Sequence, residues 1–261
     1  MSEQAKTLLL MAAVLAAVCI YAVIPQQIAV GEFFLKKMSI TALKSNTKEN
    51  ANKIEQNKTI TKTQRKKTNK IKHHTFLFIG DSMVEGLSRR FGDYAAENEH
   101  KLYTVIWYSS TTEKWAKTQT IEHFIKEYKP TYIILCLGSN ELFINDLDIR
   151  QTYIEEITKK LHNYPYVWIS PSVWNGETGI IDLIQKYVPK GSFYDSRPLK
   201  LERGADHYHP TWEASAEWMN KVADFMKSNK ATYPLRLKTP KAHHKATNTK
   251  LLQPAFEGYK K

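Results

Sequence analysis

Between residues 75 and 228, short apolar runs alternate with amphipathic stretches, and this alternation constrains the fold more than any other feature of the sequence. Short apolar runs are typical of buried strands, whereas apolar residues spaced three or four apart are typical of helices that cover a sheet. Five alternations predict an α/β fold, with a parallel sheet of about five strands and helices on both faces. The expected strands cover 75–80, 103–107, 131–138, 166–171 and 192–195, and the expected helices cover 83–98, 117–129, 146–162, 178–188 and 212–229.

The basic charge of the chain lies outside its foldable part. The formal net charge is +12, yet residues 73–229 contain 17 Lys/Arg against 21 Asp/Glu. Residues 38–72 are rich in Lys, Asn and Thr and have little apolar surface to offset chain entropy, so we expect a basic disordered linker. Residues 230–261 are expected to form a basic tail. The four residues of this tail that could dock locally are Leu251, Leu252, Phe256 and Tyr259. We therefore expect no nucleic-acid partner for the domain at 73–229.

An uncharged run of 18 residues, Thr7 to Ile24, lies near the N-terminus. This length is near the minimum for a helix that spans a bilayer. We expect residues 1–37 to form an N-terminal transmembrane helix with its flanks, and a retained anchor rather than a cleaved signal, because no clear cleavage site precedes Pro25. Lys36 and Lys37 follow the run and only Lys6 precedes it, a pattern that favours a cytoplasmic C-terminal side.

Polar side chains follow each of the first four expected strands. They occur at 80–82, 109–112, 138–141 and 170–175. In a parallel α/β sheet, ligands bind where the carboxyl ends of the strands meet, so these side chains are expected to converge.

The elements of serine-based ester hydrolysis occur in suitable places. This chemistry needs a nucleophile, a histidine base, an acid that orients it and donors for the oxyanion. Ser82 lies at a strand-to-helix turn, where its own amide is at a helix start. Asp206 and His209 precede the last helix, and their spacing lets one turn present a carboxylate and an imidazole on the same side. The neighbouring His207 is an alternative base, and a metal site at these residues would lack a further ligand cluster.

These blocks, in this order, resemble the SGNH or GDSL hydrolases over residues 75 to about 228. The resemblance rests on Gly80-Asp81-Ser82-Met83, Gly138-Ser139-Asn140-Glu141 and Asp206-His207-Tyr208-His209-Pro210. It implies a flavodoxin-like three-layer α/β/α sandwich and ester hydrolysis through an acyl-serine, with no cofactor and no metal. It also implies that Ser82 is the nucleophile, His209 the base and Asp206 its orienting acid, and that Asn140 donates to the oxyanion beside the Ser82 amide.

The block after the second strand departs from the family pattern. The family usually has a glycine whose amide completes the oxyanion hole, and Trp107 to Glu113 contains none. Thr112 falls at the equivalent position and is expected to donate instead. Residues kept as possible substrate contacts are Asp81, which is also expected to brace the nucleophile turn, Ser110, Glu141 and Trp174. Trp115, Trp212 and Trp218 are expected to be structural, and Arg197 and Arg203 either solvated or in contact with an anionic substrate.

The resemblance extends to membrane-anchored, exported bacterial proteins of this family. It implies a single-pass protein of the bacterial inner membrane with its domain in the periplasm, acting on an acylated carbohydrate of the cell envelope. The leading hypothesis is an acetylesterase for an O-acetylated peptidoglycan or polysaccharide. Three alternatives remain open: an O-acyltransferase on envelope glycan, a lipid or thioester hydrolase, and a catalytically inactive glycan-binding domain. The oligomeric state does not follow from the sequence.

Overall fold

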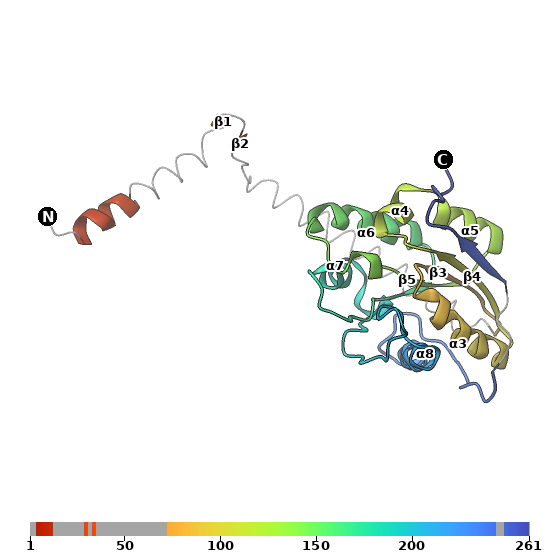
Figure 1. Cartoon of the computed structure of the whole chain (residues 1–261). Helices are drawn as coiled ribbons and strands as arrows, with labels where there is room; N and C mark the ends of the chain where they lie inside the picture. Colours follow the sequence, from red (N-terminus) through yellow and green to blue (C-terminus); the bar gives the residue numbers. More distant parts are fainter. Residues whose placement is uncertain (1–3, 13–28, 31–32, 35–71, 244–247, 261) are drawn as a thin grey trace. The chain divides into compact units, whose positions relative to one another are not determined.

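The computed structural model describes residues 4–12, 29–30, 33–34, 72–243 and 248–260 (Figure 1). The chain divides into two units, 1–57 and 58–261. In the first unit, residues 4–12 are helical, and β1 (Ala29–Val30) pairs antiparallel with β2 (Phe33–Phe34). Across the described residues, no helix has the length and apolar character needed to cross a membrane. Most of the predicted anchor, and the predicted linker apart from its last residue, lie outside the described residues.

The second unit is built from alternating strands and helices between residues 72 and 260. Its strands are β3 (Thr75–Gly80), β4 (Lys101–Trp107), β5 (Tyr132–Cys136), β6 (Tyr166–Ile169), β7 (Phe193–Tyr194) and β8 (Thr249–Leu252). Its α-helices are α3 (Val84–Glu97), α4 (Thr112–Lys117), α5 (Thr120–Tyr128), α6 (Leu147–Leu161), α7 (Ile180–Tyr187) and α8 (Trp212–Lys227). Two short 3₁₀ turns, η1 (Ser139–Glu141) and η2 (Lys190–Ser192), follow β5 and α7.

The six strands form one parallel sheet in the order β7-β6-β5-β3-β4-β8. The five predicted strands are confirmed with shifted ends. The predicted number of about five is too low, because β8 adds a sixth strand at the edge of β4. Gly80 at the end of β3 pairs with Ile106 of β4 and Cys136 of β5, so three strands end side by side. This architecture is consistent with a flavodoxin-like fold.

Helices cover both faces of the sheet, and the alternation of side chains along each strand explains why. Leu77 and Ile79 of β3, both fully buried, pack into a hydrophobic cluster with α4, α5, α6 and α7. Phe76 and Phe78 of the same strand point to the other face and pack with α3 and α8. The two helical layers are visible on either side of the strands in Figure 1. Because successive strand residues face opposite sides, both clusters draw on every central strand.

The segment after α8 belongs to this folded unit over much of its length. Tyr233, Leu235 and Leu237 are buried against the face covered by α3 and α8. After a short stretch outside the described residues, β8 pairs with β4, and Leu252 is buried while Leu251 is 50% exposed. Phe256 packs edge-to-face on Trp107 with ring centroids 5.2 Å apart, and Tyr259 stacks on His123 at 3.5 Å. Of the four residues predicted to dock locally, three are therefore packed and Leu251 is not.

Candidate active site

Ser82 lies in the turn between β3 and α3, at the carboxyl edge of the sheet. The strand ends at Gly80, which has a φ of +154°, and a Cβ atom there would lie 1.7 Å from the carbonyl oxygen of Cys136. Only glycine lets β3 approach β5 this closely before the chain turns. The amide of Asp81 then donates to the same carbonyl of Cys136 at 3.1 Å. The turn is thus fixed to the sheet immediately before Ser82, which is partly exposed.

Asp81 stabilises this turn through hydrogen bonds. Its fully buried carboxylate accepts hydrogen bonds from the amide of Met83 at 3.0 Å, the amide of Ser139 at 3.2 Å and the hydroxyl of Ser139. Burial raises the pKa of Asp81, and these hydrogen bonds oppose that rise. The expected bracing role is confirmed. The expectation of a substrate contact is wrong for Asp81, because its side chain is enclosed between the turns that follow β3 and β5.

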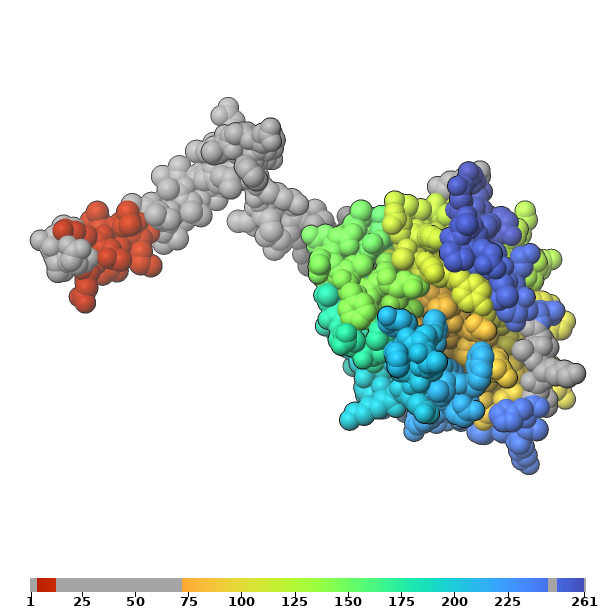
Figure 2. All heavy atoms as spheres, viewed as in Figure 1, coloured from red at the N-terminus to blue at the C-terminus, as the bar shows by residue number. Residues whose placement is uncertain are grey.

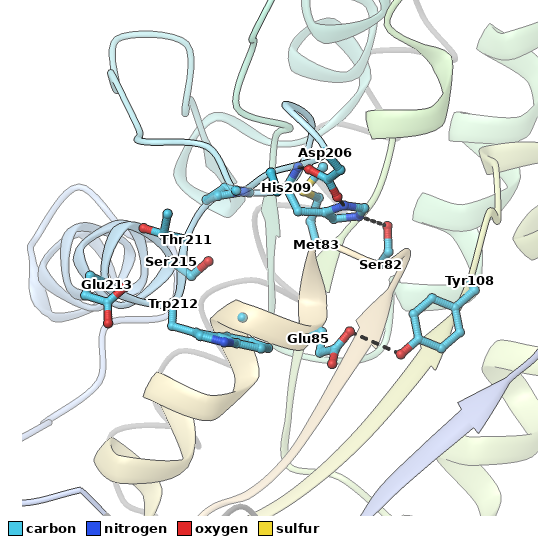
Figure 3. Close-up of a pocket in the computed structure, with 14 residues that line it drawn as sticks. Ser82, Met83, Glu85, Tyr108, Asp206, His209, Thr211, Trp212, Glu213 and Ser215 are labelled. Atoms are coloured by element: carbon cyan, nitrogen blue, oxygen red, sulfur yellow. Dashed lines mark hydrogen bonds and ion pairs between the residues drawn. The ribbon is translucent and has the colours of Figure 1, made fainter.

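The three residues predicted to act together are brought together (Figure 3). The Nε2 atom of His209 lies 2.8 Å from the Oγ atom of Ser82, and its Nδ1 atom lies 2.6 Å from Oδ2 of Asp206. The other oxygen of Asp206 accepts the amides of Tyr208 and His209, each at 2.9 Å. Hydrogen bonding from the His209 ring, and then from these amides, holds the pKa of Asp206 well below its usual range. Imidazole and carboxylate are therefore placed so that His209 can accept a proton from Ser82.

The loop that presents His209 is closed by backbone contacts. The amide of Gly204 donates to the carbonyl of His209 at 2.8 Å, and the amide of His207 donates to that of Gly204 at 3.0 Å. His207 has a φ of +64° and is exposed. The hydrogen bond to Ser82 comes from His209, so the geometry favours His209 over His207 as base.

Asn140 lies across the sheet edge from this loop, in the 3₁₀ turn after β5. Its side-chain Nδ2 donates to the carbonyl of Ser110 at 2.9 Å, and an amide group carries a second N–H for another acceptor. Ser110 itself is buried, and its hydroxyl accepts from the indole of Trp115 at 2.9 Å. The expectation that the Ser110 side chain contacts substrate is wrong. Its carbonyl orients Asn140 instead.

Thr112 does not occupy the place expected of an oxyanion donor. Its amide and its hydroxyl both donate to the carboxylate of Glu141, at 2.7 Å each, and both residues are fully buried. Burial raises the pKa of Glu141, opposed first by the hydrogen bonds from Thr112 and then by the charge of Arg150. An amide that already serves a carboxylate cannot also serve an oxyanion, so the prediction for Thr112 is wrong. For Glu141, which has no exposed surface, the predicted substrate contact is wrong too.

Trp174 contacts the loop that carries His209 and is partly exposed. Its ring meets those of Phe143 and Tyr208 edge-to-face, with centroids 5.9 Å and 5.8 Å away. Arg203 stacks over the same indole and donates to the carbonyl of Tyr208 at 2.8 Å and to Ser172 Oγ at 3.1 Å. Arg203 therefore ties the loop after β6 to the loop that carries His209. Trp174 keeps its place as a possible substrate contact.

Arg197 forms ion pairs outside the site. Its guanidinium forms ion pairs with Asp195 at 2.7 Å and with Asp182 at 2.5 Å. Arg197 is therefore paired outside the site, in a structural role. Arg203 makes structural hydrogen bonds to neutral groups and keeps its positive charge near Asp206, so anion contact stays a prediction for Arg203 alone.

A pocket of about 690 Å³ opens beside Ser82 and His209 (Figure 3). On the face shown in Figure 2, the segment around Ser82 (orange) lies between the loop before α8 (light blue) and residues after β4 (yellow). The sequence did not single out several residues of its wall, among them Glu85, Tyr108 and Trp212. Trp115 and Trp218 are fully buried as expected, whereas Trp212 is 50% exposed and lines the pocket. Its position directly after the Asp206–Pro210 block was the available signal.

The sequence matches no protein-family model and no curated protein.

Proposed function

We propose that this protein is a serine ester hydrolase of the SGNH or GDSL class. The observation that carries the proposal is the hydrogen-bonded series from Asp206 through His209 to Ser82, at 2.6 Å and 2.8 Å. Such a series activates a hydroxyl that is otherwise a weak nucleophile. Within this class, we propose an acetylesterase that removes O-acetyl groups from a glycan of the cell envelope.

The proposed reaction uses side chains in the positions described above. Ser82 Oγ attacks the ester carbonyl carbon while its proton passes to Nε2 of His209. The amide of Ser82 and Nδ2 of Asn140 donate to the oxyanion, and Asp206 stabilises the imidazolium. The carbon–oxygen bond to the alcohol then breaks, and the leaving alcohol takes the proton from His209. Water, deprotonated by His209, attacks the acyl-serine and releases acetate, which restores Ser82.

The size of the pocket supports a substrate with a bulky alcohol part. A volume of about 690 Å³ falls in the range of small-molecule sites, roughly 300–1,000 Å³, and exceeds the needs of an acetyl group. The half-exposed ring of Trp212 lines the pocket, and such a ring suits the apolar face of a sugar. An acetylated glycan satisfies both features.

A second candidate function is glycan binding without catalysis. The observation that favours it is the hydrogen bond from the Thr112 amide to Glu141, which leaves the oxyanion to Ser82 and Asn140. Removing one oxyanion donor typically costs an enzyme about 10²- to 10³-fold in rate. A protein with fewer donors binds its ligand and turns it over slowly or not at all.

We also propose that the chain is anchored in the bacterial inner membrane through residues 7–24, with the second unit in the periplasm. The periplasmic side follows from the family resemblance, against the lysine pattern around the run, which favours a cytoplasmic C-terminal side. The uncharged run supports the anchor, and Leu8, Leu9 and Leu10 at its start are exposed by two thirds. Alkaline phosphatase fused after residue 261 tests which side of the membrane the second unit occupies. In a bacterial host this enzyme becomes active only outside the cytoplasm, where its disulfides can form. An inactive, expressed fusion contradicts periplasmic placement.

Acetate release by the full chain tests the enzymatic proposal. The substrates are p-nitrophenyl acetate and O-acetylated peptidoglycan, and the matched control is Ser82→Ala. We expect the wild-type chain to release acetate from both substrates and the Ser82→Ala variant to release it from neither. Release from the small ester alone supports an esterase with another natural substrate. If folded wild-type protein is no faster than Ser82→Ala on both, glycan binding becomes the better conclusion.

A further inference from the structure

The pocket lies on the side of Ser82 that faces His209. Both residues line it, together with Asp206, whereas Asn140 does not. In ester hydrolysis the oxyanion points toward its donors, and the leaving oxygen must be within reach of the protonated base. The alcohol part of a bound ester therefore extends from Ser82 past His209, into the pocket.

The wall opposite His209 combines an aromatic ring with a carboxylate. Figure 3 shows Glu85 below Ser82, between the indole of Trp212 and the ring of Tyr108. The hydroxyl of Tyr108 donates to Oε2 of Glu85 at 3.1 Å. Burial, and then the charge of Glu85, raises the pKa of Tyr108, so its hydroxyl stays neutral at physiological pH. An indole beside a hydrogen-bond acceptor offers a stacking surface and a partner for a hydroxyl group.

The charge of the pocket is negative, opposite to that of the whole chain. Its charged lining residues, apart from the titratable His209, are Glu85, Asp206 and Glu213. The guanidinium of Arg89 lies 4.2 Å from the centroid of the Trp212 ring, but Arg89 does not line the pocket. A ligand carboxylate or phosphate placed here would meet three like charges, all on exposed side chains, so the repulsion is strongest at low ionic strength.

We propose that this pocket is the alcohol subsite of the esterase and that it selects a sugar without negative charge, stacked on Trp212 and hydrogen bonded to Glu85. This inference rests on the proposed function and adds its substrate class. Uronic acids, phosphorylated sugars and anionic lipid headgroups are disfavoured by repulsion from Glu85, Asp206 and Glu213. The basic net charge of the chain, +12, does not describe the surroundings of the reacting ester.

Two acetyl esters that differ in one carboxylate test the proposal on the full chain. They are 3-O-acetyl methyl glucoside, which is neutral, and 3-O-acetyl methyl glucuronide, which is anionic. We expect kcat/KM to be about tenfold higher for the neutral ester at low salt, and the ratio to shrink at about 0.5 M NaCl because salt screens the repulsion. Glu85→Gln should raise kcat/KM for the anionic ester about fivefold, an effect of the lost like charge.

Matched variants separate the pocket from general charge effects. Glu217→Gln makes the same change of charge on α8, at an exposed position that does not line the pocket. It should leave the ratio of kcat/KM between the neutral and the anionic ester unchanged. Trp212→Ala should raise KM for the neutral ester about tenfold while kcat falls less, because stacking contributes to binding. Trp212 is half exposed, so this variant is expected to fold.

The outcomes distinguish this inference from the proposed function. If Ser82 is required for hydrolysis but both esters react equally in the wild-type chain, the subsite proposal is overturned and the esterase stands. A preference for the anionic ester overturns it as well. If neither these esters nor p-nitrophenyl acetate release acetate in a Ser82-dependent way, the esterase and its alcohol subsite fail together.

Discussion

The carboxylate of Glu141 accepts hydrogen bonds from both the amide and the hydroxyl of Thr112, each 2.7 Å long, inside the protein. Thr112 begins α4, and Glu141 ends the 3₁₀ turn that carries Asn140. The pair therefore joins two turns at the carboxyl edge of the sheet. In addition, Nε of Arg150 lies 3.4 Å from Oε1 of Glu141, which offsets the cost of burying the charge.

The substitution Glu141→Gln tests whether the Thr112–Glu141 pair holds these two turns together. In glutamine, an NH₂ group replaces one of the two carboxylate oxygens that accept from Thr112, so one Thr112 donor loses its acceptor. A buried donor left unpaired costs about 1–3 kcal/mol. We expect the free energy of unfolding to fall by this amount in urea titrations. We also expect kcat to fall more than KM rises, because Asn140 shifts with its turn. Glu99→Gln, an exposed change, is the control. An unchanged unfolding midpoint would contradict the structural role of Glu141.

Asp206→Asn and His207→Asn form a second matched pair. Loss of the Asp206 carboxylate removes the acceptor that orients His209, and in serine hydrolases such a change lowers kcat by up to about 10⁴-fold. His207→Asn retains a residue type that tolerates positive φ, and we expect near wild-type kcat. Steady-state kinetics on p-nitrophenyl acetate measures both. A larger loss in His207→Asn than in Asp206→Asn would reverse the assignment of the base.

Two histidines at the opposite end of the sheet make stability depend on pH. Burial lowers the pKa of His74 and of His100 from 6.5 to about 4. The unfolded chain therefore binds protons before the folded one, and stability is present above pH 6.5 and lost as pH falls toward 4. Asp81 and Glu141, whose pKa values are raised, act in the opposite direction.

Chemical denaturation between pH 4 and 7 measures this dependence. The double variant His74→Gln/His100→Gln should flatten the curve between pH 6.5 and 4, while His162→Gln, an exposed change, should keep its slope. An equally steep loss of stability in the double variant would assign the dependence to other groups.

Leu252 and Leu251 are neighbours in β8 with opposite environments, 5% and 50% exposed. Leu252→Ala should reduce the free energy of unfolding by about 2–4 kcal/mol, because it removes buried methyl groups that pack on the sheet. Leu251→Ala should cost well under 1 kcal/mol. Equal effects of the two substitutions in urea titrations would show that β8 is not docked as described.

The central strands could be predicted because each is a continuous apolar run that ends in turn residues. Residues 131–138 read as a strand covered on both faces, and β5 is fully buried. In contrast, β8 has the sequence Thr-Lys-Leu-Leu, and three of its four side chains are exposed. An edge strand with one buried side chain has no periodic signal, so composition assigned it to a tail.

The candidate site also contains some residues that the sequence predicts and others that it does not. Ser82, Asp206 and His209 could be predicted from local sequence, because each lies in a short block beside a strand end or helix start. The partner of the Thr112 amide could not, since Glu141 is distant in sequence and meets it only through the parallel pairing of the strands. The pocket wall is likewise formed by three separate segments, around Glu85, Tyr108 and Trp212.

The place of β8 in the sheet affects how the chain folds during synthesis. Thr104 of β4 pairs with Thr249, which belongs to the last of the six strands along the chain. A nascent chain can pair β3, β4, β5, β6 and β7 and dock α8 before residues 249–252 have left the ribosome. One edge of β4 then keeps its backbone N–H and C=O groups unpaired until those residues emerge. Synthesis therefore delays the closing of this edge behind the pairing of the other five strands.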